Sequence, residues 1–142
     1  MPKKMRVAMI GCGQIARYLH VPDYALCPEA EIVGLCDLIK SKAETLAARW
    51  APEAAIYTDY KRMLKELAPE AVTVALPNCL HAPVTIAALK AGCHVNVEKP
   101  MACSSAEANH MVATAKECGR LLNVNQSQRL FPPHVKAKEV IC

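Results

Sequence analysis

A glycine-rich turn at residues 11–13 is the sequence feature that most constrains the fold. It reads Gly-Cys-Gly, follows an apolar run at residues 7–10, and precedes residues 14–16, which predict the start of a helix. Gly11 suits a tight turn because a residue without Cβ takes that backbone shape at no steric cost. Ala16 is small enough for a strand and a helix to pack closely. The pattern therefore predicts a buried strand, a tight turn and a helix.

The same turn suits a diphosphate. Gly13 leaves the main chain bare, so a diphosphate can approach backbone N–H groups at the positive end of the helix dipole. A second apolar run at residues 32–36 ends at Asp37, about twenty residues past Ala16, where a dinucleotide site needs a carboxylate for ribose hydroxyls. These features predict dinucleotide binding; an ordinary strand–helix turn is the alternative.

The composition favours one α/β domain. A chain of 142 residues is one domain by length. Hydrophobic residues make up 53% of it but aromatic residues only 4%, so the core must be aliphatic. Such a core suits a parallel sheet covered by helices.

Charge and hydropathy argue against two classes of partner. The net charge is +4, but the basic residues are scattered and not interleaved with aromatics, so we expect no nucleic-acid partner. The apolar runs are strand-sized and no secretion signal is evident, so we expect no membrane partner and a cytoplasmic location.

The cysteines do not form a metal site. None of the eight is part of a C-x-x-C pair or followed by a ligand-spaced histidine, so we expect no metal. Most lie in apolar segments, where a free cysteine acts as a small hydrophobe. We therefore expect free thiols in a reducing compartment.

Apolar periodicity divides the chain into alternating strands and helices. The expected strands are residues 7–10, 32–36, 56–57, 71–76, 94–97 and 121–124, and the expected helices follow each in turn. Strands and helices that alternate with short loops imply right-handed crossovers and an α/β doubly wound parallel sheet, the Rossmann arrangement.

Local signals set several helix ends. Ser41 with Glu44, and Ser104 with Glu107, have capping-box spacing and predict helix starts. Residues 78–81 are expected to form a loop before a helix over residues 84–91.

Other sequence signals predict where two helices end and which face of one helix is buried. Gly92 and Gly119 are expected to end their helices in left-handed conformations. The buried stripe of the helix before Gly119 is expected to be Ala108, Met111, Val112 and Ala115.

Four motifs together resemble a known family. They are GCGQIARYLHVP at residues 11–22, Asp37, Leu76-Pro77-Asn78-x-x-His81, and Glu98-Lys99-Pro100 directly after a strand. In this order they resemble the N-terminal half of the Gfo/Idh/MocA oxidoreductases, the family of glucose-fructose oxidoreductase and inositol dehydrogenase. The resemblance covers nearly the whole chain.

The resemblance implies a cofactor site. Gly11, Gly13 and the amides around Gln14 and Ile15 would hold the pyrophosphate, and Asp37 would accept hydrogen bonds from the adenosine ribose. An acid at this position repels a 2′-phosphate, so NAD should be preferred to NADP.

Lys40 and Lys42, close in sequence to Asp37, could weaken that preference.

Two further segments would complete the site. Leu76, Pro77 and Asn78 follow a central strand, at the crevice where α/β sheets bind ligands. By the resemblance they border the ribose nearest the nicotinamide, and Glu98 and Lys99 occupy the equivalent place one strand on.

Lys99 is the implied catalytic residue. In the family this lysine lies beside the nicotinamide and the substrate, holds the reacting hydroxyl and assists proton transfer. The chemistry suits lysine, whose ammonium can hold an oxygen and exchange a proton with it. A surface lysine in a turn is the alternative. Pro100 makes the preceding bond a candidate cis peptide.

The histidines have simpler expected roles. His81 is expected to cap the helix that follows it, while His20 and His94 are expected to serve in packing or at the surface. His110 is expected to be helical and exposed. Cys12 is expected only to face the strand, with a redox role as the alternative.

The resemblance also suggests two regions. Residues 1–125 form the expected dinucleotide-binding domain, and residues 126–142 lead toward a substrate domain. In relatives an α+β domain follows and supplies substrate contacts and an oligomer interface; here we expect it to be absent or truncated. The chain alone is then not expected to turn over efficiently, and the exposed face could favour a homo-oligomer.

Three functions remain open. The first is the cofactor domain of an NAD(P)-dependent oxidoreductase acting on a CH–OH group of a sugar, polyol or related substrate. The second is a non-catalytic dinucleotide-binding or sensing module. The third is part of a glycosidase of the same family, which would use NAD transiently and release sugar without net NADH change.

Overall fold

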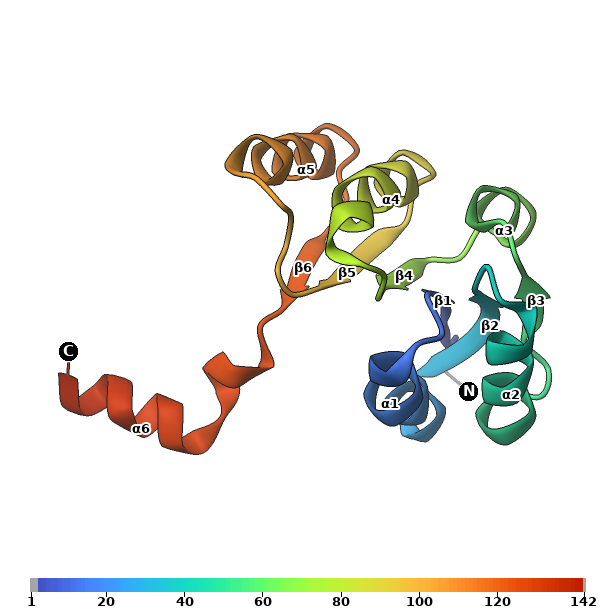
Figure 1. Ribbon diagram of the computed structural model, residues 1–142, viewed down its shortest axis with the longest axis horizontal. Helices are drawn as coiled ribbons and strands as arrows, with labels where there is room; N and C mark the ends of the chain where they lie inside the picture. Colours follow the sequence, from blue (N-terminus) through green and yellow to red (C-terminus); the bar gives the residue numbers. More distant parts are fainter. Residues whose placement is uncertain (1–2, 142) are drawn as a thin grey trace.

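The computed structural model describes residues 3–141 and contains a six-stranded parallel sheet with the order β3-β2-β1-β4-β5-β6 (Figure 1). The strands are β1 Met5–Ile10, β2 Ala30–Cys36, β3 Ala55–Tyr57, β4 Ala71–Val74, β5 His94–Glu98 and β6 Leu122–Asn125. β1 and β4 are central neighbours, and the chain winds outward from them in both directions. The predicted doubly wound α/β sheet is confirmed.

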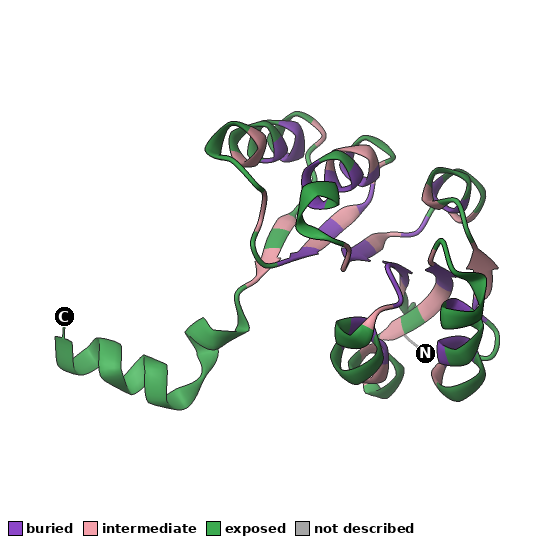
Figure 2. Ribbon diagram, in the orientation of Figure 1, coloured by how far each residue is buried: buried purple, intermediate pink, exposed green. Residues whose placement is uncertain are grey.

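Helices cover both faces of the sheet (Figure 1). One side carries α1 Val21–Leu26, which continues a π-helical segment η1 Ala16–His20, and α2 Lys40–Trp50. The other carries α3 Tyr60–Leu67, α4 Asn78–Lys90 and α5 Ser105–Glu117. Each helix turns its buried residues toward the strands, as Figure 2 shows. Among the described residues, no helix has the length and apolarity to cross a membrane.

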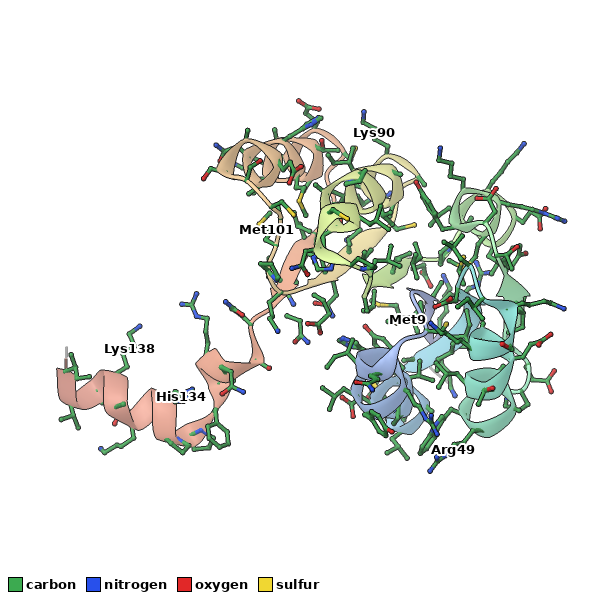
Figure 3. The ribbon with its side chains drawn as sticks, in the orientation of Figure 1. Met9, Arg49, Lys90, Met101, His134 and Lys138 are labelled. Atoms are coloured by element: carbon green, nitrogen blue, oxygen red, sulfur yellow. The ribbon has the colours of Figure 1, made fainter. Side chains whose placement is uncertain are left out.

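The strands place alternate residues in two separate cores. Met9 and Leu35 pack with residues of η1, α1 and α2 on one side, whereas Ile10, Val74 and Val97 pack with residues of α3, α4 and α5 on the other. Side chains alternate between the faces of a strand, so central strands buried on both sides read as continuous apolar runs. In Figure 3, Met9 lies within the molecule.

The first helix is widened in its middle. Val21 N–H donates to the Ala16 carbonyl, five residues back, which is the π-helical pattern. Pro22 follows in the first turn of α1, where a proline ring has no N–H and crowds the carbonyl four residues earlier. This places His20 at the end of the widened segment.

Two predicted helix starts are wrong. α2 begins at Lys40 with Ile39 at its N-cap and no side-chain cap. Glu44 pairs instead with Lys40, 3.0 Å away, so Ser41 and Glu44 do not form a capping box.

The predicted loop at residues 78–81 is also wrong, because α4 begins at Asn78. Pro77 occupies its N-cap with φ of −54° and ψ of 142°, the non-helical backbone typical of the residue before a helix. Pro83 then lies within the first turns of α4 and does not delay the helix.

The start of α5 matches its prediction. Ser104 Oγ accepts from Glu107 N–H at 3.2 Å, while Glu107 Oε2 accepts from Cys103 N–H at 2.9 Å, one residue earlier than in the standard box. The predicted buried face of α5 is partly wrong. Met111 and Ala115 are buried, but Val112 is 41% exposed, and Thr114 is buried in its place.

Both predicted helix ends are confirmed. Gly92 has φ of +89° and Gly119 φ of +62°. These left-handed conformations favour glycine.

After β6 the chain leaves the sheet. A 3₁₀ turn at Ser127–Leu130 leads into α6 Pro132–Ile141. α6 has no buried residue among those described and appears entirely green in Figure 2.

Candidate functional site

The predicted residues converge at the carboxyl ends of β1, β2, β4 and β5. The chain winds away from the centre between β1 and β4, which makes this edge the switch point where open α/β sheets bind ligands. Gly11 has φ of +97°, so the tight turn requires a glycine there. A Cβ built on Gly13 meets no atom within 4 Å, so the main chain beside it faces open space. This open backbone fits a diphosphate.

The helix after the turn supplies hydrogen-bond donors. Arg17 N–H donates to the Gly13 carbonyl at 3.0 Å, which starts the helical hydrogen bonding. A helix leaves its first N–H groups without helical partners, so the amides around Gln14 and Ile15 are available to an anion. Both side chains are exposed, while Ala16 is fully buried against the sheet.

Asp37 lies against the glycine turn although 25 residues separate it from Cys12. Its Oδ2 accepts from Cys12 N–H at 2.8 Å and its Oδ1 accepts from Ile39 N–H at 2.9 Å. Those two bonds fix the carboxylate at the end of β2 while leaving further lone pairs on both oxygens. The geometry thus brings together the two parts of the predicted dinucleotide site.

A mostly apolar cavity of about 180 Å³ adjoins Asp37. Leu38, Tyr60, Leu76 and Pro83 contribute to its walls. An apolar slot beside a fixed carboxylate suits a flat ring attached to a ribose. Leu76 lies in the wall of this cavity, and Pro77 and Asn78 are exposed at the start of α4.

Cys12 is buried in the turn, as expected, and its Sγ lies 3.7 Å from the Cys36 carbonyl oxygen. Burial, with the Asp37 charge as the second cause, raises the pKa of Cys12 to about 12. A thiol reacts as its thiolate, so the structure gives no support to a redox role for this cysteine.

Glu98 and Lys99 differ in exposure. Lys99 is exposed at the end of β5, whereas Glu98 is only 7% exposed. Glu98 Oε1 accepts from His20 Nε2 at 2.8 Å and from Asn125 Nδ2 at 2.5 Å, and Oε2 accepts from Lys99 N–H at 3.2 Å. The Lys99–Pro100 peptide bond is cis, as the sequence allowed.

Two opposing effects act on the Glu98 carboxyl. Burial raises its pKa, but hydrogen bonds from Asn125, His20 and the Lys99 amide outweigh burial. The pKa therefore lies below its usual value, and Glu98 is a carboxylate at neutral pH.

His81 does not cap a helix, contrary to the sequence prediction. It lies within α4 and is 1% exposed. Its Nδ1 faces the Pro100 carbonyl oxygen at 2.7 Å and its Nε2 faces the Leu76 carbonyl oxygen at 2.8 Å. The ring thus connects the segments that follow β4 and β5.

Sequence reasoning missed His20 and Asn125 as members of the site. His20 was expected only in packing or at the surface, yet it is 8% exposed and bonded to Glu98, 78 residues away. The only local signal was position: His20 follows the glycine turn by two helical turns, and Asn125 ends a strand next to β5.

Among the described residues, no three His, Cys, Asp or Glu side chains gather as a metal site.

Comparison with known proteins places this site in a family. The family model of the Gfo/Idh/MocA oxidoreductases, described as an oxidoreductase family with an NAD-binding Rossmann fold, matches residues 5–126. The chain belongs to this family. The resemblance drawn from the four motifs is confirmed, and the Gfo/Idh/MocA chain carries an NAD(P)-binding Rossmann domain.

Curated relatives of this Gfo/Idh/MocA chain include a D-glucoside dehydrogenase and a glycosyl hydrolase. It is 39% identical over 118 residues to D-glucoside 3-dehydrogenase of Escherichia coli, covering 83% of this chain and 33% of that one. It is 39% identical over 134 residues to glycosyl hydrolase family 109 protein 1 of Akkermansia muciniphila, covering 86% and 28%. The chain therefore spans about a third of the length of the curated relatives it matches.

A solved structure agrees in fold. The 3-ketoreductase from Actinomadura kijaniata, crystallised with NADP, superposes with a TM-score of 0.90 at 29% identity, covering 98% of this chain and 44% of that one. NADP in that relative leaves the choice between NAD and NADP open for the Gfo/Idh/MocA chain described here.

Proposed function

We propose that this chain is the cofactor-binding part of an oxidoreductase that oxidises or reduces a CH–OH carbon of a sugar or polyol. Residues 1–125 would form the cofactor domain, and residues 126–142 would lead toward a substrate domain. The observation that best supports this proposal is the open main chain at Gly13, which lies beside the fixed carboxylate of Asp37.

Each predicted residue has a place in this proposal. Gly11, Gly13 and the amides around Gln14 and Ile15 hold the pyrophosphate. Asp37 holds the adenosine ribose. Leu76, Pro77 and Asn78 line the crevice toward the nicotinamide ribose, with Glu98 and Lys99 at the nicotinamide end.

Lys99 is the proposed catalytic residue. A bound nicotinamide supplies the hydride acceptor or donor. Lys99 holds the reacting oxygen through its Nζ and exchanges the hydroxyl proton with it. Its exposure at the mouth of the crevice leaves the ammonium free to reach a substrate.

We infer that NAD is preferred to NADP. The Asp37 carboxylate is held at the ribose end by Cys12 and Ile39 amides. A 2′-phosphate there would meet a fixed negative charge. Lys40 is engaged with Glu44, so it is less available to offset that charge.

Titration calorimetry with NADH, NADPH and ADP-ribose tests the proposal. NADH and ADP-ribose should bind, and NADPH should bind at least about tenfold more weakly than NADH, since like charges in close approach cost several kcal/mol. Gly13→Ala should weaken binding of both NADH and ADP-ribose, because its Cβ occupies the diphosphate approach.

The controls separate folding from binding. Gly13→Ala should melt like the parent, since its Cβ meets no atom. Asp37→Ser should narrow the difference in affinity between NADH and NADPH, whereas Glu53→Gln, which removes the charge of an exposed acid, should not. Folded protein that binds neither NADH nor ADP-ribose would refute the proposal.

A second function is favoured by one comparison. The 39% identity to a family 109 glycosyl hydrolase supports a glycosidase that uses NAD transiently. Such an enzyme would release sugar with no net change in NADH absorbance, whereas a dehydrogenase would change it with each turnover. Measuring sugar release and NADH absorbance in a protein completed with a substrate domain distinguishes a glycosidase from a dehydrogenase.

A further inference from the structure

Lys99 lies between two residues that are each held by a buried histidine from a different helical segment. Before it, the Glu98 carboxylate is bonded to His20 at the end of η1. After it, the Pro100 carbonyl oxygen faces His81 in α4. The lysine is exposed, but both of its neighbours are tied to the interior.

The His20 contact has a defined direction. Glu98 is a carboxylate and can only accept, so Nε2 of His20 is the donor in the 2.8 Å contact. Asn125 donates to the same oxygen from β6, and the Lys99 N–H donates to the other. A buried carboxylate with three donors is held in one orientation, and so is the backbone amide of Lys99.

The His81 contact joins the two ends of the crevice. Its ring nitrogens face the Leu76 and Pro100 carbonyl oxygens at 2.8 and 2.7 Å. A carbonyl only accepts, and a neutral imidazole carries one N–H, so the tautomer of His81 decides which of the two oxygens receives the hydrogen bond. Leu76 forms part of the apolar cavity beside Asp37, and His81 therefore fixes the Lys99 segment relative to the cavity wall.

The Lys99 side chain needs such support. Among residues 3–141, its Nζ has no hydrogen bond or ion pair with another side chain. A lysine has a flexible four-carbon stem, so its backbone must be fixed if the ammonium is to be presented to one place.

We propose that His20 and His81 are positioning residues that hold the Glu98–Pro100 segment so that Lys99 meets the nicotinamide half of the cofactor. This inference rests on the proposed function. It also assigns Glu98 a positioning role, as the partner of His20 and of the Lys99 amide.

Affinities for NADH and ADP-ribose separate the two halves of the cofactor, because ADP-ribose lacks the nicotinamide. His20→Leu and His81→Leu should each weaken NADH binding by about fivefold or more, the effect of losing a buried hydrogen bond. ADP-ribose affinity should stay within about twofold. A general loss of structure would lower the bound fraction for both ligands alike.

Glutamine variants of His20 and His81 test whether an N–H donor is what each position needs. His20→Gln keeps one N–H donor for Glu98 and should retain most NADH affinity. His81→Gln can also donate to one of the two carbonyl oxygens, so it should retain more NADH affinity than His81→Leu. His110→Leu, on the exposed side of α5, is the matched histidine control and should change neither affinity.

A double-variant cycle tests whether the histidines act through Lys99. Lys99→Ala should weaken NADH binding by itself, and adding His20→Leu to it should cause little further loss. Additive losses would overturn the proposal, as would equal losses of NADH and ADP-ribose affinity in His20→Leu. If the parent binds neither ligand, the proposed function itself fails; if it binds both but the histidine variants match the parent, only this inference fails.

Discussion

Gly11 packs directly against the carbonyl group of Ala75, and a Cβ at residue 11 would lie 2.1 Å from the Ala75 oxygen. Ala75 N–H in turn donates to the Ile10 carbonyl at 2.9 Å, so the end of β4 is fixed against the glycine turn. The obstructing atom is backbone and cannot move aside. Gly11 is therefore required by close packing as well as by its φ of +97°.

Gly11→Ala should destabilise the protein by about 3 kcal/mol or more, because strain in the left-handed region adds to an overlap that shifts two strands. Urea unfolding followed by circular dichroism measures this change. Gly13→Ala is the matched control, since its Cβ meets no atom within 4 Å. Equal stability of the two variants would contradict the packing argument.

Two buried threonines should respond in opposite ways to replacement by valine. Thr73 Oγ1 bonds with the Tyr24 hydroxyl at 2.7 Å, whereas Thr85 Oγ1 has no partner among the described residues. Thr73→Val should cost about 1 kcal/mol, and Thr85→Val should be neutral or stabilising, because it removes an unsatisfied hydroxyl.

Chemical denaturation of the two valine variants side by side tests this contrast. Both threonines are at most 1% exposed, so their burial is matched. A loss of stability in Thr85→Val as large as that in Thr73→Val would show that the Thr85 hydroxyl has a partner after all.

Thiol labelling should divide the cysteines by burial. Burial, then the charge of Asp37, raises the pKa of both Cys12 and Cys36 to about 12. Cys79 and Cys103 are exposed. Iodoacetamide at about pH 8 should therefore label Cys79 and Cys103 first, since alkylation requires an accessible thiolate.

Peptide mass spectrometry at successive times reads out the order of labelling, and denatured protein provides the reference in which all thiols react. Cys142 lies outside the described residues and carries no prediction. Rapid labelling of Cys12 in folded protein would reopen the redox role for the glycine turn.

The Glu98 carboxylate should make stability depend on acid pH. Its pKa in the folded protein lies below the usual 4.5, so its stabilising effect is present above about pH 4.5 and is lost as the pH falls through the folded pKa. Glu98→Gln should melt lower than the parent at about pH 6, and the difference should shrink toward about pH 3.

Glu66→Gln is the control for this acid effect. Glu66 also has a lowered pKa, chiefly from its hydrogen bond with Arg62, but it is exposed to solvent. Solvent screening should keep the effect of that variant on the melting temperature small. A constant gap between Glu98→Gln and the parent across this pH range would contradict the assignment.

Catalysis by Lys99 can be tested in a chimera. Residues 1–126 fused to the remaining part of E. coli D-glucoside 3-dehydrogenase should give an enzyme whose turnover falls about 100-fold or more in Lys99→Ala, the usual scale for losing a general acid–base group. Lys90→Ala, on the exposed side of α4 where Lys90 projects outward (Figure 3), should be neutral. Full activity of the Lys99→Ala chimera would exclude the catalytic role.

Much of the architecture could be predicted because its signals are local. The apolar runs of the central strands, the glycines at 92 and 119, and the Ser104 cap each depend on residues a few positions apart. The two wrong helix starts show the limit of that reasoning. Lys40 pairs with Glu44 across one helical turn, and α4 begins directly after Pro77, at residues predicted to form a loop.

By itself the sequence determined the order of strands and helices, the glycine turn, and the acid at Asp37, because backbone sterics and hydrophobic periodicity operate between neighbours. Only the tertiary structure decided that His20 meets Glu98 across 78 residues and that His81 joins Leu76 to Pro100. A polar side chain that becomes buried must find partners wherever the packed chain places them. Those partners depend on how the strands are ordered in the sheet, and no local sequence pattern predicts that order.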